Sequence, residues 1–96
     1  MIVQHKQREG SGYFYVQVDG EKLARMTYTQ PDSENMFIEH TEVDDEIRGK
    51  NVGYQMVKTA VQFARNHQLK IVPVCPFVKS VFDKKREYED VLNKSQ

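Results

Sequence analysis

The hydrophobic period of the sequence changes at Gly53, and this change constrains the fold more than any other feature. Before Gly53, apolar side chains alternate with polar ones, which is the pattern of half-buried strands. After it, apolar residues recur at helical spacing between positions 56 and 64, which predicts an amphipathic helix. Because a chain of 96 residues has room for one hydrophobic core, we expect a single domain over residues 1–96.

Strands are predicted ahead of this helix at residues 12–18, 21–29 and 35–43, with a weaker candidate at residues 2–7. Asp19-Gly20 can supply the positive φ values of a two-residue type I′ turn, which joins the first two of these strands as a hairpin.

After the main helix, residues 69–74 form a short, β-branched, apolar run that is typical of a buried strand. Pro76 suits the first position of a second helix, and residues 87–92 predict a last short one. The order β-β-β-β-α-β-α indicates an α+β fold in which helices cover the sheet.

The charges balance, with 14 Lys and Arg against 14 Asp and Glu. A net charge of zero provides no field toward nucleic acid or anionic membranes, so we predict neither as a partner. A signal-peptide core and a long apolar stretch are both missing, which favours a cytoplasmic protein. His5 and His67 have no companion at metal-ligand spacing and Cys75 is the single cysteine, so we predict no metal and no internal disulfide.

The turn ahead of the main helix is Arg48-Gly49-Lys50-Asn51-Val52-Gly53. A helix start exposes unpaired N–H groups and partial positive charge, and small residues let a phosphate approach them. We interpret the turn as an anion cradle, with Arg48 and Lys50 at its rim and Gly53 leaving room for a pyrophosphate. The alternative is a connection that needs glycine only for its geometry. The Walker and dinucleotide patterns do not match, because their further glycines are missing.

This turn resembles the acetyl-CoA signature of the GNAT acetyltransferase superfamily, Arg/Gln-x-x-Gly-x-Gly/Ala, at Arg48, Asn51 and Gly53. Together with His40-Thr41-Glu42-Val43 and Cys75-Pro76-Phe77-Val78, it resembles the small, minimal members of that superfamily over nearly the whole chain. The resemblance implies a mixed, mainly antiparallel sheet of about five strands, covered by a main helix and one or two C-terminal helices. It also implies an acetyl-CoA site made by Val43, Arg48, Gly49, Lys50, Asn51, Val52 and Gly53.

The sequence departs from the superfamily pattern in two places. Asn51 replaces the central glycine; it tolerates a left-handed backbone but leaves less room, so we expect weaker affinity for coenzyme A. Typical members carry helices between their first two strands that help to form the acceptor pocket, whereas this chain has only residues 8–11 there.

Three residues are candidates for catalysis: Cys75, His40 and Glu42. Cys75 would be the N-cap of the second helix, where the helix dipole favours a thiolate that can act as nucleophile or base. His40 shares a predicted strand face with Met36 and Ile38 and could act as a general base. If the strands that carry these residues splay at the coenzyme, both side chains would face the thioester. A buried, inert cysteine and a structural histidine are the alternatives.

The resemblance implies an N-acetyltransferase that acts on an unidentified amine of a small molecule or protein. Transfer would be direct, with His40 or Glu42 as base, or would pass through a thioester on Cys75. A coenzyme A binding module with little activity is the alternative, and a plain interaction domain is a third possibility. Lysines after the second helix, such as Lys84 and Lys85, favour a solvated face, although coenzyme phosphates could reach one of them. We expect a monomer or a weak homodimer.

Overall fold

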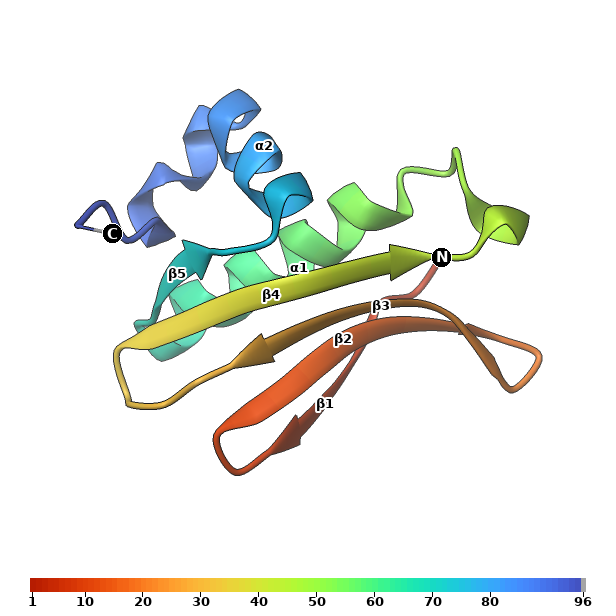
Figure 1. The fold of residues 1–96 in the computed structure, drawn as a ribbon, viewed down its shortest axis with the longest axis horizontal. Coiled ribbons are helices and arrows are strands. Elements are labelled where there is room, and N and C mark those ends of the chain that lie inside the picture. Colours follow the sequence, from red (N-terminus) through yellow and green to blue (C-terminus); the bar gives the residue numbers. More distant parts are fainter. Residues whose placement is uncertain (96) are drawn as a thin grey trace.

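The computed structural model describes residues 1–95, which form one five-stranded sheet with helices packed against it (Figure 1). The fold is α+β, as the sequence predicts. The elements in chain order are β1 (Gln4–Arg8), β2 (Ser11–Val18), β3 (Glu21–Thr29), β4 (Asn35–Val43), the 3₁₀ turn η1 (Asp45–Ile47), α1 (Val52–His67), β5 (Lys70–Pro73), α2 (Pro76–Lys84) and the 3₁₀ segment η2 (Arg86–Val91).

The strands lie in the order β1-β2-β3-β4-β5. The first four form an antiparallel meander, and β4 and β5 are parallel because α1 carries the chain across between them. The bounds of β3 and β4 match their sequence predictions, and the Asp19-Gly20 turn has the expected positive φ at both residues. The weak candidate at residues 2–7 is a strand that begins two residues later, at Gln4.

The core lies between one face of the sheet and α1. This helix packs against β2, β3, β4 and β5, and it runs along the sheet (Figure 1). Its apolar stripe is fully buried, as the helical period predicts. The buried residues of the stripe are Met56, Val57, Ala60, Val61 and Ala64. They meet the buried sheet residues Phe14, Val16, Met26, Tyr28, Met36 and Ile38.

The edge strand β1 is anchored by a histidine. His5 stacks on Phe14 with ring centroids 4.1 Å apart, and its Nε2 lies 2.6 Å from the hydroxyl of Tyr28. Burial raises the pKa of Tyr28, so this hydroxyl keeps its proton and can donate to His5. Burial, and secondarily the neighbouring His67, lower the pKa of His5. The sequence assigned no role to His5, whose partners come from three other elements.

The C-terminal segment is held to α1 by ion pairing. Arg65 of α1 contacts Asp90 of η2 through two bonds of 2.8 Å, Nε to Oδ2 and Nη2 to Oδ1. A third bond of 2.7 Å reaches the carbonyl oxygen of Glu87. These bonds fix η2 beside α1 and thereby position the lysines that precede it.

A β-bulge in β4 reverses the face of the strand's second half. Thr27 pairs with His40, whereas the next residue of β3, Tyr28, pairs with Ile38, so Glu39 is the extra residue. Side chains alternate between faces in a strand, and one inserted residue exchanges the faces beyond it. The expectation that His40 shares a face with Met36 and Ile38 is therefore wrong, because the bulge turns His40 to the opposite face.

The parallel strands separate beyond Ile38. Pairing between β4 and β5 covers Asn35–Ile38 and ends at Pro73, which has no N–H to donate. The N–H groups of Val74 and Cys75 both bond to the carbonyl oxygen of Ile38, at 3.0 and 2.9 Å. Beyond this point β4 continues to Val43 while the chain turns into α2, as Figure 1 shows. The two strands therefore splay beyond Ile38, which the sequence reasoning had set only as a condition.

The first two strands are joined directly. Arg8 pairs with Ser11, so the connection is a tight turn at Glu9-Gly10, with Gly10 at φ +79°. Within residues 1–95, no helix lies between β1 and β2. None of the helices in this part of the chain is long and apolar enough to cross a membrane.

Candidate functional site: a cleft at the start of α1

The loop between η1 and α1 contains two residues with positive φ, Gly49 and Asn51. Asp44 caps η1 by accepting a 2.9 Å hydrogen bond from the N–H of Glu46. Gly49 has φ +89° with open space around it, and Asn51 has φ 58° and ψ 28°. Asn51 is the N-cap of α1, and its side chain makes no capping bond. The prediction that Asn51 supports a left-handed backbone is confirmed.

The backbone N–H groups of residues 49–54 donate no hydrogen bond to the described part of the chain. The first paired amide is that of Gln55, which bonds to the carbonyl oxygen of Asn51 at 3.0 Å. These free amides stand at the positive end of a helix of 16 residues. An anion bound there would receive several N–H bonds and a favourable dipole, which supports the anion-cradle interpretation.

The free amides border a cleft of about 410 Å³. Thr41 and Val43 of β4 form one side of the cleft, and Tyr54 and Phe77 contribute two aromatic rings. The predicted coenzyme residues on the cleft are Val43, Arg48, Gly49, Asn51, Val52 and Gly53. Lys50, predicted with them, is exposed and does not line the cleft. Sequence reasoning missed Thr41, Tyr54 and Phe77. The fold brings Phe77 of α2 to this loop and the bulge in β4 turns Thr41 toward it, whereas Tyr54 directly follows the loop in sequence.

Gly53 has a different role from the one predicted. A Cβ built on Gly53 would lie 2.7 Å from Cζ and 2.8 Å from Cε2 of Phe77. The space above Gly53 therefore holds an aromatic ring, and the expectation that it is kept for a pyrophosphate is wrong. The ring of Phe77 also meets that of Tyr54 edge-on, with centroids 5.6 Å apart.

The two cations predicted at the rim differ in their surroundings. Arg48 forms an ion pair with Asp45 at 2.9 Å, and its Nη2 donates a 3.4 Å bond to the carbonyl oxygen of Val43. Its side chain is 70% exposed, so this pairing is weak and an anion can compete for the guanidinium. Lys50 is exposed, and its carbonyl oxygen accepts a 3.3 Å bond from the side chain of Gln55.

A second groove, of about 820 Å³, adjoins the cleft and shares Asn51 and Tyr54 with it. Three lysines line it, Lys58 from α1 and Lys84 and Lys85 from the end of α2, together with one carboxylate. Lys58 is exposed, and its approach to Lys84 depends on how α1 packs against α2.

Cys75 lies on the cleft side of β4. It is the N-cap of α2, as predicted, and it is 6% exposed. Its Sγ lies 3.4 Å from the hydroxyl oxygen of Thr41, and Thr41 lines the cleft. The thiol is therefore next to the cleft but nearly covered.

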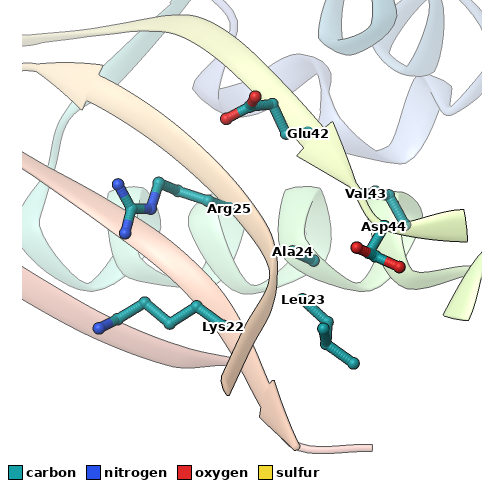
Figure 2. A pocket seen from close by; sticks show the side chains of 7 residues that line it. All are labelled: Lys22, Leu23, Ala24, Arg25, Glu42, Val43 and Asp44. Carbon is teal, nitrogen blue, oxygen red and sulfur yellow. The ribbon is translucent and has the colours of Figure 1, made fainter. Parts of the chain in front are cut away.

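His40 and Glu42 lie on the opposite face of β4 from Thr41. Their side chains are 65% and 70% exposed, and His40 Nε2 is 3.8 Å from Glu42 Oε2. Glu42 borders a separate hollow of about 310 Å³ with Lys22 and Arg25 of β3 (Figure 2). The expectation that His40 and Cys75 face the same side is wrong, because the bulge at Glu39 separates them. Within residues 1–95, no cluster of three His, Cys, Asp or Glu side chains is arranged to hold a metal ion.

Residues 13–91 match the family described as GCN5-related N-acetyl-transferase. The chain belongs to this family. The sequence of this chain is 36% identical to that of a GCN5-like putative N-acetyltransferase from Staphylococcus aureus, whose structure was determined in solution by NMR. Its TM-score is 0.70, and the match covers 94% of this chain and 87% of that one.

Larger acetyltransferases share the fold of this GCN5-related N-acetyltransferase domain. A ribosomal-protein-alanine N-acetyltransferase from Brucella melitensis biovar Abortus 2308 is 19% identical, with a TM-score of 0.60 over 91% of this chain and 66% of that one. A GNAT family acetyltransferase from Elizabethkingia anophelis, which has acetyl-CoA bound, is 18% identical, with a TM-score of 0.57 over 68% of this chain and 43% of that one. No curated protein matches the chain.

Proposed function

We propose that this protein is an acetyl-CoA-dependent N-acetyltransferase. The run of free amides at residues 49–54, opening into a cleft beside the splayed strands, carries this proposal. Family membership and the acetyl-CoA bound to the Elizabethkingia enzyme support it. Acetyl-CoA is the substrate that supplies the acetyl group.

Each part of the coenzyme has residues of matching chemistry. The amides of residues 49–54 suit its pyrophosphate, and Arg48 can add charge there. The apolar wall at Val43 and Phe77 suits the pantetheine arm. The lysines of the adjoining groove, Lys58 and Lys84 among them, suit the phosphate on the adenosine end. The residues therefore fit the phosphates and the pantetheine arm of this substrate.

Two chemical routes fit the side chains. In direct transfer, His40 or Glu42 accepts the proton of the attacking amine from the exposed face of β4. In the covalent route, the acetyl group passes first to Cys75, whose Sγ is next to the cleft and near the hydroxyl of Thr41. Cys75→Ser separates them: the covalent route predicts loss of acetyl transfer, and unchanged turnover would eliminate it.

A coenzyme A binding module with little activity is the second candidate. The observation that favours it is the tight turn at Glu9-Gly10, which leaves the chain without acceptor-covering helices between β1 and β2. Assays of acetyl transfer to a panel of amines distinguish the two, since a binding module would bind acetyl-CoA without turnover.

An NMR titration with acetyl-CoA tests the shared requirement. We expect the largest amide shifts at residues 49–54, with smaller shifts at Thr41 and Phe77. Lys58→Glu should weaken binding, since it reverses a charge in the groove, whereas the matched control Lys6→Glu on β1 should not. Shifts confined to another part of the chain would overturn the proposed site.

A further inference from the structure

The sheet face opposite α1 is uncovered. Cross-strand pairing aligns its side chains in rows: Lys6 with Tyr13, Thr27 and His40, and Tyr15 with Arg25 and Glu42. The helices of residues 1–95 pack against the other face, which carries the core. We call this surface the open sheet face. It consists of Lys6, Tyr13, Tyr15, Lys22, Arg25, Thr27, Phe37, Glu39, His40 and Glu42.

Aromatic rings and cations form the middle of the open sheet face. Tyr13 and Tyr15 are half-buried, with ring centroids 5.3 Å apart. The guanidinium of Arg25 lies 4.6 Å from the ring of Tyr13, and the ammonium of Lys22 lies 5.4 Å from the ring of Tyr15. Tyrosine and arginine are enriched where proteins dock, because they combine apolar area with directed polar groups.

The charges of this face are separated by strand. The carboxylates of Glu39 and Glu42 stand on β4, and the cations of Lys22 and Arg25 stand on β3, farther from β5. Because β4 borders the splay, a protonated amine that reaches the thioester there would pass its carboxylates. Residues beside that amine would meet the cations of β3, where acidic side chains bind best.

The face offers no enclosure for a small amine. The hollow beside Glu42 measures about 310 Å³ and is lined by both signs of charge, as Figure 2 shows for Arg25, Lys22 and Asp44. Sites for small ligands usually bury most of the ligand surface. With a tight turn between β1 and β2, the described chain places no helix over this hollow. A protein acceptor would supply the missing contact area itself.

We infer that the open sheet face docks a protein segment whose reacting amine, a lysine or an N-terminus, is flanked by Asp or Glu. This inference rests on the proposed function and names its acceptor class. In the transfer, the amine nitrogen forms a bond to the thioester carbonyl carbon and the carbon–sulfur bond breaks. Glu42 or His40 accepts one proton from the arriving ammonium, which leaves the neutral amine that attacks. Coenzyme A leaves with the electron pair on sulfur and takes up the second proton that the nitrogen loses.

Matched peptides test the inference. Three peptides of equal length present one lysine flanked by Asp and Glu, by Ser and Gly, or by Lys and Arg. Acetylated product is measured by mass spectrometry, and ethanolamine serves as a small amine. We expect kcat/KM to be highest for the acidic peptide, on the order of tenfold above the neutral one, because charged groups across an interface select partners. Ethanolamine should be the poorest acceptor.

Reversing the charge of Arg25 tests whether this residue selects among the acceptor peptides. Arg25→Glu should lower kcat/KM for the acidic peptide and raise it for the basic one, so the preference inverts. Lys79→Glu, on the exposed side of α2, is the matched control and should leave the preference unchanged. Arg25→Gln should reduce the preference without inverting it, and circular dichroism checks that each variant is folded. If Arg25→Glu is unfolded, the Arg25→Gln result decides.

The outcomes separate this inference from the proposed function. If calorimetry shows no acetyl-CoA binding by the wild-type protein, the proposed function fails, and the inference fails with it. If acetyl-CoA binds but the peptides are acetylated without regard to their flanks, only the inference is overturned. It is also overturned if sedimentation shows that the open sheet face pairs two copies of the chain, or if an oligonucleotide binds there in place of the peptides.

Discussion

Replacing Gly53 by alanine should strain the contact between α1 and α2. Alanine stabilises a helix by roughly 0.5–1 kcal/mol relative to glycine. The new Cβ would lie 2.7 Å from Phe77 Cζ, whereas ordinary contacts are about 3.5–4.0 Å, so the ring must retreat by about 1 Å. Forcing such an overlap costs about 1–3 kcal/mol. We expect a net loss of about 1 kcal/mol, which lowers the unfolding midpoint by about 4–8 °C in a domain of this size.

The assay is a double-mutant cycle on thermal and urea unfolding. Phe77→Leu removes the ring atoms that would clash but keeps an apolar side chain. In that background Gly53→Ala should become stabilising by roughly 0.5–1 kcal/mol, the full helix increment. The coupling between the two positions would then be about 1.5–2 kcal/mol, well above the deviation from additivity expected of independent sites. The displaced ring should also narrow the cleft, so calorimetry should find weaker acetyl-CoA binding by the single variant.

One result would refute the reasoning. If Gly53→Ala stabilises the protein equally in both backgrounds, contact with the ring of Phe77 is not the reason that residue 53 is glycine. Retention of wild-type acetyl-CoA affinity alongside that additivity would show that the ring does not limit the cleft.

Three further predictions follow from the same structure. Asn51→Gly should bind acetyl-CoA more tightly by calorimetry, because glycine adopts φ 58° without a side chain beside the amides; equal or weaker binding would contradict the steric argument. Burial and His67 lower the pKa of His5 below its ordinary 6.5. The unfolded chain therefore binds this proton first, so stability falls as pH drops below about 6.5, and His5→Gln should flatten the midpoint-versus-pH curve there. Arg65 lowers the pKa of Asp90, so the stability from this pair is present above pH 3.8 and is lost as the pH falls through the lower folded pKa; Asp90→Asn should remove that dependence, and an unchanged acid limb would contradict it.

Much of the site could be predicted because it is local in sequence. The left-handed conformation of Asn51 was expected because this residue replaces a glycine of the signature that the turn resembles, and the helix that follows was predicted from the spacing of its apolar residues. The N-cap position of Cys75 follows in the same way from the proline after it. Residues that meet across elements were missed, as with Thr41 beside Cys75 and Phe77 above Gly53.

A single inserted residue, Glu39, decided which face of β4 carries the side chain of His40. Regular alternation from Met36 would put His40 on the core face, and the sequence contains no clear signal that Glu39 is extra. The bulge arises in the pairing of β3 with β4, which brings Tyr28 and Ile38 together on the core face. It turns His40 to the open sheet face and leaves Thr41 beside the cleft.

The sequence by itself determined the order of the strands and helices, the bounds of β3 and β4, and the loop that leaves amides free at the start of α1. These features depend on periodicity, turn residues and helix termini, which act over a few neighbouring residues. Only the tertiary structure decided which face His40 presents, what fills the space above Gly53 and which lysines meet beside the cleft. Those outcomes depend on strand register and helix packing between residues far apart in the chain, where burial of the shared core selects one arrangement.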